Sequence, residues 1–245
     1  MDSGYYAATT GLVARTQALD SAASNLSNAQ TPGFRAEREF FRSTLLGPDA
    51  FDSQLGKTVN DYGLLGGDHL DMAQGALTLT GNPLDLAIQG EGFFEVQTAR
   101  GVRYTRDGGF HRSSTGQFVT AAGEPVLSAS GLTIQLPPGE LSVGADGAVS
   151  VAGGVVATVG VFTFPIGAQM MPEGANRYVA PQGAAATLSK KATVHQGAIE
   201  AANQDVIQGS LDLIVMQRQA EMMQKALTVF HTEFNKIATE DLPKI

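Results

Sequence analysis

Apolar residues recur at helical spacing at both ends of the chain, whereas the middle alternates apolar and polar residues over short runs. From Tyr5 onwards the N-terminal apolar positions follow steps of three and four residues, with Arg15 the one polar side chain among them. This spacing predicts a helix with one narrow apolar stripe. We call the large residues of this stripe the N-terminal seam, and they are Leu12, Leu19 and Leu26.

The C-terminal pattern is longer and more regular. It runs from Val206 to Ile237 in unbroken steps of three and four, without a charged residue at any stripe position. Such persistence is typical of a coiled coil, although the core helix of a bundle is the plainer alternative. Asn203 can cap the start of this helix. The large residues of the stripe, which we call the C-terminal seam, are Val206, Leu213, Met216, Met223, Leu227, Phe230, Phe234 and Ile237.

The region between the helices predicts antiparallel β-structure. Of the 29 glycines, 25 fall between residues 47 and 197, and no proline falls within 3–31 or 198–242. Apolar and polar residues alternate over 84–127 between glycine-containing turns, and Asp107-Gly108 has the composition of a tight hairpin. Because this region predicts no further long helix, the partners available to the C-terminal helix are the N-terminal helix and copies of the same chain.

We therefore expect an α+β fold, with long N- and C-terminal helices that pair as a coiled coil and a central, Gly-rich, mainly antiparallel β domain. The expected organisation has four parts. They are an N-terminal helix and turn at 1–34, an irregular connector at 35–75, the β domain at 76–198 and the C-terminal helix at 199–245.

The N-terminal helix is expected to stop in an unusual stretch, "SNLSNAQTPGF". Proline cannot continue a helix, and glycine accepts the positive φ angles of tight turns. We interpret the stretch as a joint between the helix and the domain that it carries. Its residues are Asn25, Asn28, Pro32, Gly33 and Phe34.

Composition narrows the possible functions. The net charge is −8 and the pI is near 4.9, which disfavours non-specific binding of nucleic acid. The cationic residues Arg100, Arg103, Arg106 and Arg112 form only a short cluster. The chain has no cysteine, no cleavable signal peptide by its N-terminal pattern and no 18-residue apolar run, so we expect neither disulfides, Sec export nor a membrane span.

Candidate catalytic motifs are weak. Gly56-Lys57-Thr58 resembles the end of a phosphate-binding loop, but Phe51 stands where that motif needs glycine. The stretch 68–71, which holds one histidine and two aspartates, could ligate a metal, although a surface loop is the simpler interpretation. No Gly-x-Ser-x-Gly sequence occurs. We predict no catalytic, cofactor-binding or metal-binding residue and no small-molecule substrate.

Four blocks together resemble the bacterial flagellar basal-body rod and hook family. They are "AASNLSNAQTPGF", "NPLDLAIQGEGFFEV", "YTRDGGFHRSSTGQFVTAAGEPVL" and "HQGAIEAANQDVIQGSLDLIVMQRQAEMMQKAL", and they lie in the family's order over most of the chain. "TPGFRAE" and the modest length are most similar to the proximal-rod type, with the distal-rod protein as the close alternative. One departure is that Gln219 and Ala220 follow Arg218, where the family often has an aromatic residue.

The resemblance implies a structural protein and not an enzyme. Its terminal helices would polymerise into the hollow drive shaft that transmits torque and conducts exported subunits. The implied partners are copies of itself, other rod subunits and the flagellar export apparatus, with no nucleic acid and no direct membrane insertion. The implied location is the periplasmic rod, reached through type III export without a cleaved signal. The remaining alternatives are a distal-rod or hook-type subunit and a non-flagellar coiled-coil scaffold.

Overall fold

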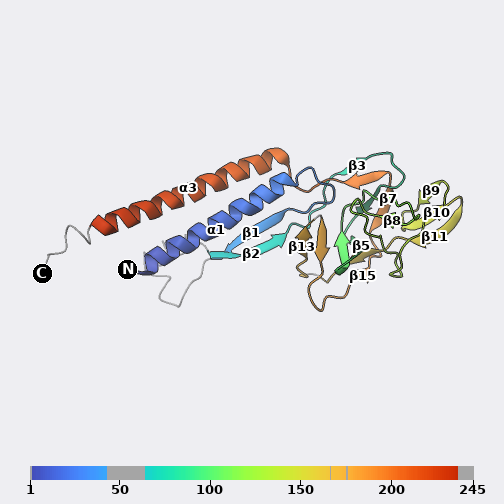
Figure 1. The fold of residues 1–245 in the computed structure, drawn as a ribbon, viewed down its shortest axis with the longest axis horizontal. Coiled ribbons are helices and arrows are strands. Elements are labelled where there is room, and N and C mark those ends of the chain that lie inside the picture. The colour runs from blue at the N-terminus through green and yellow to red at the C-terminus, as the bar shows by residue number, and fades with distance from the viewer. Residues whose placement is uncertain (1, 43–63, 166, 175, 237–245) are drawn as a thin grey trace. The chain divides into compact units, whose positions relative to one another are not determined.

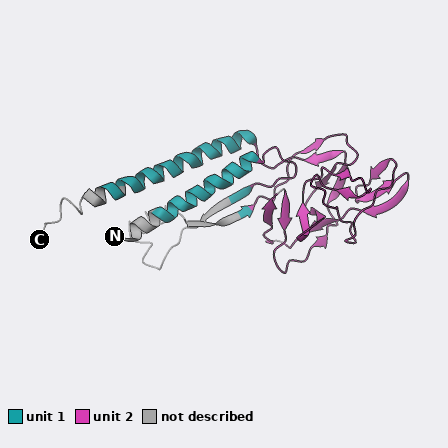
Figure 2. Ribbon diagram, in the orientation of Figure 1, with its two compact units in different colours: residues 1–27, 37–69, 206–245 teal, residues 28–36, 70–205 magenta. Residues whose placement is uncertain are grey.

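The computed structural model describes residues 2–42, 64–165, 167–174 and 176–236. It contains two compact units, which are described separately below (Figure 2). Unit 1 comprises residues 1–27, 37–69 and 206–245, and unit 2 comprises residues 28–36 and 70–205. The α+β class is confirmed, because two long helices accompany strands that pair antiparallel.

Unit 1 holds both helices. Helix α1 spans Asp2–Ser27, and helix α3 spans Val206–Lys236 and lies along it (Figure 1). Both segments lack internal proline, so the backbone ladder of each helix is uninterrupted. No described helix is both long enough and apolar enough to cross a membrane.

Unit 1 also contains a two-stranded sheet of β1 (Glu37–Arg42) and β2 (Leu64–Leu70). These strands lie inside the range for which the sequence predicted an irregular connector, so that range is more ordered than expected. The alternation in "EREFFR" suits an extended strand, whereas the glycines in "LLGGDHL" obscured the second one. The rest of the connector, residues 43–63, lies outside the described residues.

Unit 2 is built from short strands. Its largest sheet has six strands in the order β13-β14-β6-β5-β12-β15, with every neighbouring pair antiparallel. These strands are β5 (Phe93–Thr98), β6 (Gly101–Thr105), β12 (Val161–Thr163), β13 (Met171–Gly174), β14 (Arg177–Val179) and β15 (Thr187–Leu188).

Smaller sheets complete the unit. One contains β9 (Leu141–Val143), β10 (Ala148–Val151) and β11 (Gly154–Thr158), and another contains β7 (His111–Arg112) and β8 (Phe118–Val119). In the last two sheets the earliest strands of the unit pair with its latest. There β3 (Leu77–Leu79) pairs with β17 (Ala198–Glu200), and β4 (Leu86–Gln89) pairs with β16 (Thr193–Gln196).

The prediction of a hairpin at Asp107-Gly108 was wrong. Strand β6 pairs with β5 and β14, and the tight hairpin of this region joins β5 to β6. Gly108 is needed for a different reason, because a Cβ atom there would lie 1.6 Å from the carbonyl oxygen of Leu86. The glycine thus marks a close approach of two backbones instead of a hairpin turn.

Two apolar clusters form the core of unit 2. The larger one includes Leu86, Ile88, Phe94 and Val126, all fully buried. The smaller one is aromatic and includes Phe93 and Tyr178, whose ring centroids lie 5.6 Å apart. Burying aliphatic and aromatic side chains of this size stabilises a fold by about 1.5–3 kcal/mol each.

Candidate assembly site

Helix α1 buries a stripe of small residues. Gly11, Ala14 and Ala18 are buried in the first two thirds of the helix, and Asn25 is buried near its end. Small side chains allow a neighbouring backbone to approach closely, which a stripe of leucines would prevent. The residues of the predicted N-terminal seam lie beside this stripe and are half-buried, namely Leu12, Leu19 and Leu26.

The C-terminal seam lies on the more buried side of α3 over the described part of the helix. Gly209 is buried, and Arg15 of α1 donates a hydrogen bond to Oε1 of Gln219 over 3.0 Å. Val206 is exposed. The half-buried seam residues are Leu213, Met216, Met223 and Leu227, while the side chains of Phe230 and Phe234 and all of Ile237 lie outside the described residues.

A second apolar stripe of α3 is exposed among the residues that the structure describes. Ile207 is 74% exposed and Met222 is 63% exposed. These positions and their apolar neighbours are separated by four, three, one, seven and seven residues, a spacing that places them on one face of the helix, which differs from the seam. We call this the outer stripe, and its residues are Ile207, Leu211, Ile214, Val215, Met222 and Val229.

The joint begins with an asparagine that binds backbone in both directions. The amide nitrogen of buried Asn25 donates to the carbonyl oxygen of Glu37 over 2.8 Å, and its oxygen accepts from the Glu37 N–H over 2.9 Å. One side chain therefore fastens the end of α1 to the start of β1. Aspartate could accept the second bond but could not donate the first.

The turn after α1 is fixed by backbone contacts. The N–H of Thr31 donates to the carbonyl of Asn28, and the N–H of Phe34 donates to the carbonyl of Thr31. Asn176 donates its side-chain amide to the carbonyl of Pro32 over 2.7 Å. These bonds hold the Thr-Pro-Gly-Phe segment in one conformation and attach it to the rest of unit 2, of which it is a part.

Gly33 is the tightest point of this turn. Its φ is +69°, which favours glycine, and its N–H donates to the carbonyl of Glu200 over 2.7 Å. A Cβ atom at this position would lie 2.2 Å from the backbone nitrogen of Asp107. Both the conformation and the available space therefore require glycine.

Next to the turn lies a buried ionic triad of Arg35, Arg106 and Glu200. Nη2 of Arg35 lies 2.8 Å from Oε1 of Glu200, and Nη1 of Arg106 lies 2.8 Å from Oε2 of the same carboxylate. The three side chains are at most 3% exposed. Arg106 also donates to the carbonyls of Ile88 and Gly90. One carboxylate thus lies between two cations in the interior of unit 2.

Burial governs the charges around the triad. Removal from water lowers the pKa of the Arg106 guanidinium, and the attraction of Glu200 opposes that shift. Burial likewise raises the pKa of the neighbouring Asp107, while the hydrogen bond from the Gly109 N–H opposes it. Arginine keeps its charge in proteins even under such a shift, so Glu200 is the compensating anion.

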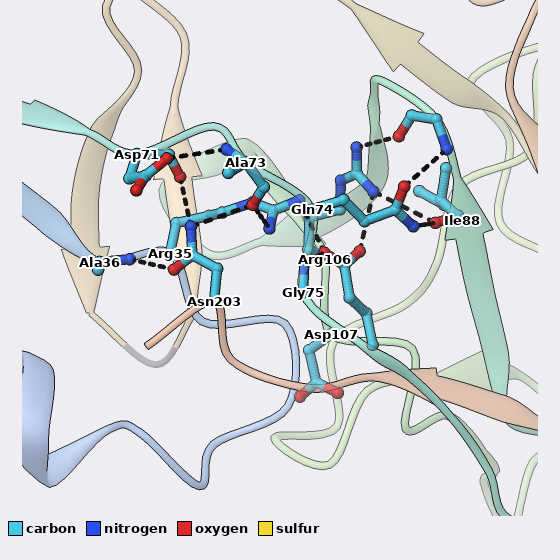
Figure 3. Close-up of polar contacts among 12 residues, drawn as sticks. Arg35, Ala36, Asp71, Ala73, Gln74, Gly75, Ile88, Arg106, Asp107 and Asn203 are labelled. Atoms are coloured by element: carbon cyan, nitrogen blue, oxygen red, sulfur yellow. Dashed lines mark hydrogen bonds and ion pairs between the residues drawn. The ribbon is translucent and has the colours of Figure 1, made fainter. Parts of the chain in front are cut away.

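Asn203 does not cap α3, which corrects the prediction from sequence. Its side-chain oxygen accepts from the N–H of Ala36 over 2.8 Å, and its amide nitrogen donates to the carbonyls of Asp71 and Ala73 (Figure 3). The residue therefore cross-links three distant segments of unit 2. Helix α3 begins three positions later, at Val206.

The short cationic cluster is divided between separate partners. Arg106 enters the triad, whereas Arg103 makes two hydrogen bonds with Glu173, through its Nε over 2.6 Å and its Nη2 over 2.8 Å. That pairing lowers the pKa of the Glu173 carboxyl to about 2. The cluster is thus used for intramolecular ion pairs at two places in the fold.

The described residues contain no group of three or more His, Asp or Glu side chains that could hold a metal ion. The described part of unit 2 includes two depressions among its surface features. One, of about 390 Å³, is bordered by Ser128, Leu132 and Gln135, and the other, of about 320 Å³, is bordered by Arg112 and Glu140. Neither depression is lined by a histidine that could serve as a base for a nearby hydroxyl.

Comparison with known proteins shows which family has these features. Residues 6–35 match the family model described as flagella basal body rod protein, and residues 87–151 match the flagellar hook protein FlgE/F/G D1 domain. The chain is 35% identical to the flagellar basal-body rod protein FlgF of Caulobacter vibrioides over the whole of both chains. The chain belongs to the flagellar basal-body rod protein family.

Further relatives support the same family. FlgF of Mesorhizobium japonicum is 32% identical over 90% of each chain, and FlgG of Bacillus subtilis is 30% identical over 91% of this chain and 93% of its own length. As a FlgF-like member, the protein is a structural component of the flagellar basal body and not an enzyme. Membership also removes the non-flagellar scaffold from the alternatives.

The two family matches cover the N-terminal joint and the centre of unit 2. The triad draws Arg35 from the first match and Arg106 from the second. Sequence reasoning missed Arg35, Glu200 and the true role of Asn203. A charged residue in an otherwise apolar or glycine-rich stretch could have indicated a buried ion pair. Nothing in the sequence, however, showed which of these distant residues pair with one another.

Proposed function

We propose that this rod subunit polymerises through its two terminal helices into the hollow shaft that transmits torque and conducts exported subunits. The observation that carries this mode of assembly is the outer stripe of α3, which the described part of the chain leaves exposed. Apolar stripes on two faces of one helix cannot both be covered by a single partner helix. Repeated contacts of this kind between unlike faces build an open helix instead of a closed ring.

The partners in this proposal are copies of the chain and other rod subunits. The N- and C-terminal seams would pair as a coiled coil, and the outer stripe would pack against the next subunit. Export through the flagellar apparatus, without a cleaved signal, would deliver the subunit to the periplasmic rod. The joint of Asn25, Asn28, Pro32, Gly33 and Phe34 would set the direction in which unit 2 leaves the helices.

Similarity to FlgF proteins over the full length supports a position in the proximal rod. A distal-rod or hook-type position is the second candidate, and the 30% identity to FlgG of Bacillus subtilis favours it. Labelling unit 2 with a small epitope tag in isolated basal bodies would distinguish them. The proposal expects the label near the base of the rod, and a label at its outer end would contradict the proximal position.

The assembly role can be tested by placing charge on the outer stripe. Leu211→Asp and Met222→Asp alter exposed side chains, so the chain should fold as before. A buried carboxylate in a subunit contact is costly, and we expect rod incorporation and swimming to fall at least about tenfold. Swimming on soft agar and the amount of protein in purified basal bodies measure the effect.

Gln224→Asp is the matched control, because Gln224 is also exposed on α3 but does not belong to either stripe. It should leave incorporation and swimming unchanged. Circular dichroism of the purified variants checks that all three fold alike. Wild-type swimming of both stripe variants would refute assembly through this face.

A further inference from the structure

The chain passes between the two units at four places, after residues 27, 36, 69 and 205. Three segments of unit 2 adjoin these crossings, namely residues 33–36, 71–75 and 200–203. We call them the crossing segments. Although up to about 170 positions separate them in sequence, they lie together within unit 2.

Backbone bonds join each crossing segment to another. The N–H of Gly33 donates to the carbonyl of Glu200 over 2.7 Å, and the N–H of Asn203 donates to the carbonyl of Phe34 over 3.3 Å. The N–H of Asp71 donates to the carbonyl of Ala36 over 2.8 Å. Asn203 adds the side-chain bonds described above. The segments therefore form one hydrogen-bonded bundle.

The triad supplies the strongest bonds of this bundle. Arg35 of the first segment binds both Glu200 of the third and the carbonyl of Ala73 in the second. The carboxylate of Glu200 also accepts from the N–H of Gly75 over 2.9 Å. Arg106, which follows strand β6, anchors the same carboxylate to the interior and lies 5.6 Å from the centroid of the Phe93 ring.

Stability alone does not explain such an arrangement. Replacing a buried ion pair by apolar side chains of similar volume is often neutral or stabilising. The Nε atoms of Arg35 and Arg106 are buried and find no hydrogen-bond partner among the described residues, so the triad is not fully satisfied there. Charged, forked groups fix the direction of each bond that they make, whereas apolar groups do not.

We propose that the Arg35–Glu200–Arg106 triad is a mechanical clamp, which makes the three crossing segments open only together. Force that reaches unit 2 along any one of its connections to the helices is then shared among all of them. The clamping itself follows from the contacts within unit 2, and its use in carrying torque rests on the proposed function.

Native-state hydrogen exchange of the full chain tests the clamp. Gly33, Asp71, Gly75 and Asn203 each donate a backbone N–H within the bundle. In the wild type these four amides should exchange at one common opening rate. In Arg35→Met they should exchange at separate rates, with at least one roughly tenfold faster, because two directional bonds are lost.

A triple variant separates clamping from stability. Arg35→Met, Arg106→Met and Glu200→Leu together replace the triad by apolar groups, so the urea midpoint of the chain should stay near the wild-type value. The four amides should nevertheless exchange independently. Retention of one common rate in this variant would overturn the proposal, as would equal loss of protection at the core amides of Phe118 and Val126.

Arg177→Met is the matched control. Arg177 pairs with Glu124 elsewhere in unit 2, where both side chains are partly exposed. This change should leave the common rate of the four amides intact. A control that uncouples the amides as Arg35→Met does would also overturn the proposal.

Swimming in medium of raised viscosity tests the mechanical use of the clamp. The triple variant should assemble and swim normally in dilute medium but lose speed faster than wild type as viscosity increases. Uncoupled exchange with unaffected swimming would refute the role in carrying torque and leave the clamp standing. Failure of the rod assignment would instead appear as absence of the wild-type protein from basal bodies.

Discussion

At the scale of single residues, Gly33 combines two constraints, a positive φ angle and a close approach of another backbone segment. Its positive φ alone would cost an alanine about 1–2 kcal/mol. The 2.2 Å approach to the backbone of Asp107 adds a clash that no side-chain rotation can relieve. The sequence predicted the turn from Thr-Pro-Gly, but it could not predict the second constraint, because Asp107 is distant in the chain.

Gly33→Ala should therefore lower the free energy of unfolding by about 2–5 kcal/mol, the sum of strain and overpacking. Gly81→Ala is the control, since Gly81 has φ of +73° and no atom of the described residues lies within 4 Å of an added Cβ. It should cost only the strain of about 1–2 kcal/mol. Urea denaturation of both variants measures the difference, and equal costs would show that the clash is relieved by movement of the turn.

Because the hydroxyl of Tyr104 titrates differently in the folded chain, we expect the stability of the fold to depend on pH in the alkaline range. Burial, together with the nearby Glu95 carboxylate, raises the pKa of its hydroxyl from the ordinary 10.0 to about 12 in the folded chain. The unfolded chain thus releases this proton first as the pH rises. The contribution of Tyr104 to stability is complete below pH 10 and is lost as the pH rises through about 12.

Tyr104→Phe removes this titration. The free energy of unfolding should fall less steeply in the variant than in wild type between pH 10 and 12, and the two slopes should agree between pH 8 and 9. Urea denaturation across that range gives both curves. Parallel curves throughout would mean that Tyr104 does not titrate differently in the folded chain.

At the scale of elements, the periodicity of α1 was easier to predict than its buried face. The pattern singled out Leu12, Leu19 and Leu26 because large apolar residues dominate any such pattern. The structure buries the smaller Gly11, Ala14 and Ala18 more completely and leaves the leucines at the flank. Two backbones can approach closely only where the side chains between them are small. A pattern of hydrophobic residues does not reveal this preference.

Ala18→Leu should disturb the packing of α1. Ala18 is 2% exposed, so the added atoms must displace neighbours, at a cost of about 1–3 kcal/mol. Ala23→Leu is the matched control on the exposed side of the same helix and should change stability by no more than about 0.5 kcal/mol. Thermal unfolding followed by helical circular dichroism tests the pair, and a stable Ala18→Leu variant would indicate unfilled space beside α1.

At the scale of the whole molecule, the sequence predicted the fold class and the family but not the centre of unit 2. Helical periodicity and glycine-rich alternation are local patterns, and both were visible. The meeting of Arg35 with Glu200 depends on the pairing of β3 with β17 and of β4 with β16, which joins the two ends of the unit. No local pattern encodes such a contact, so Asn203 was assigned to a helix cap.

The same pairing has a consequence for the order in which the chain can fold. A ribosome releases Leu77 and Leu86 long before their partner strands, which end at Glu200 and Gln196. Closing so long a loop is entropically costly and slow, so β3 and β4 have no partner strand until β17 and β16 have been synthesised. Folding of unit 2 thus finishes only when its last strand, β17, has been synthesised.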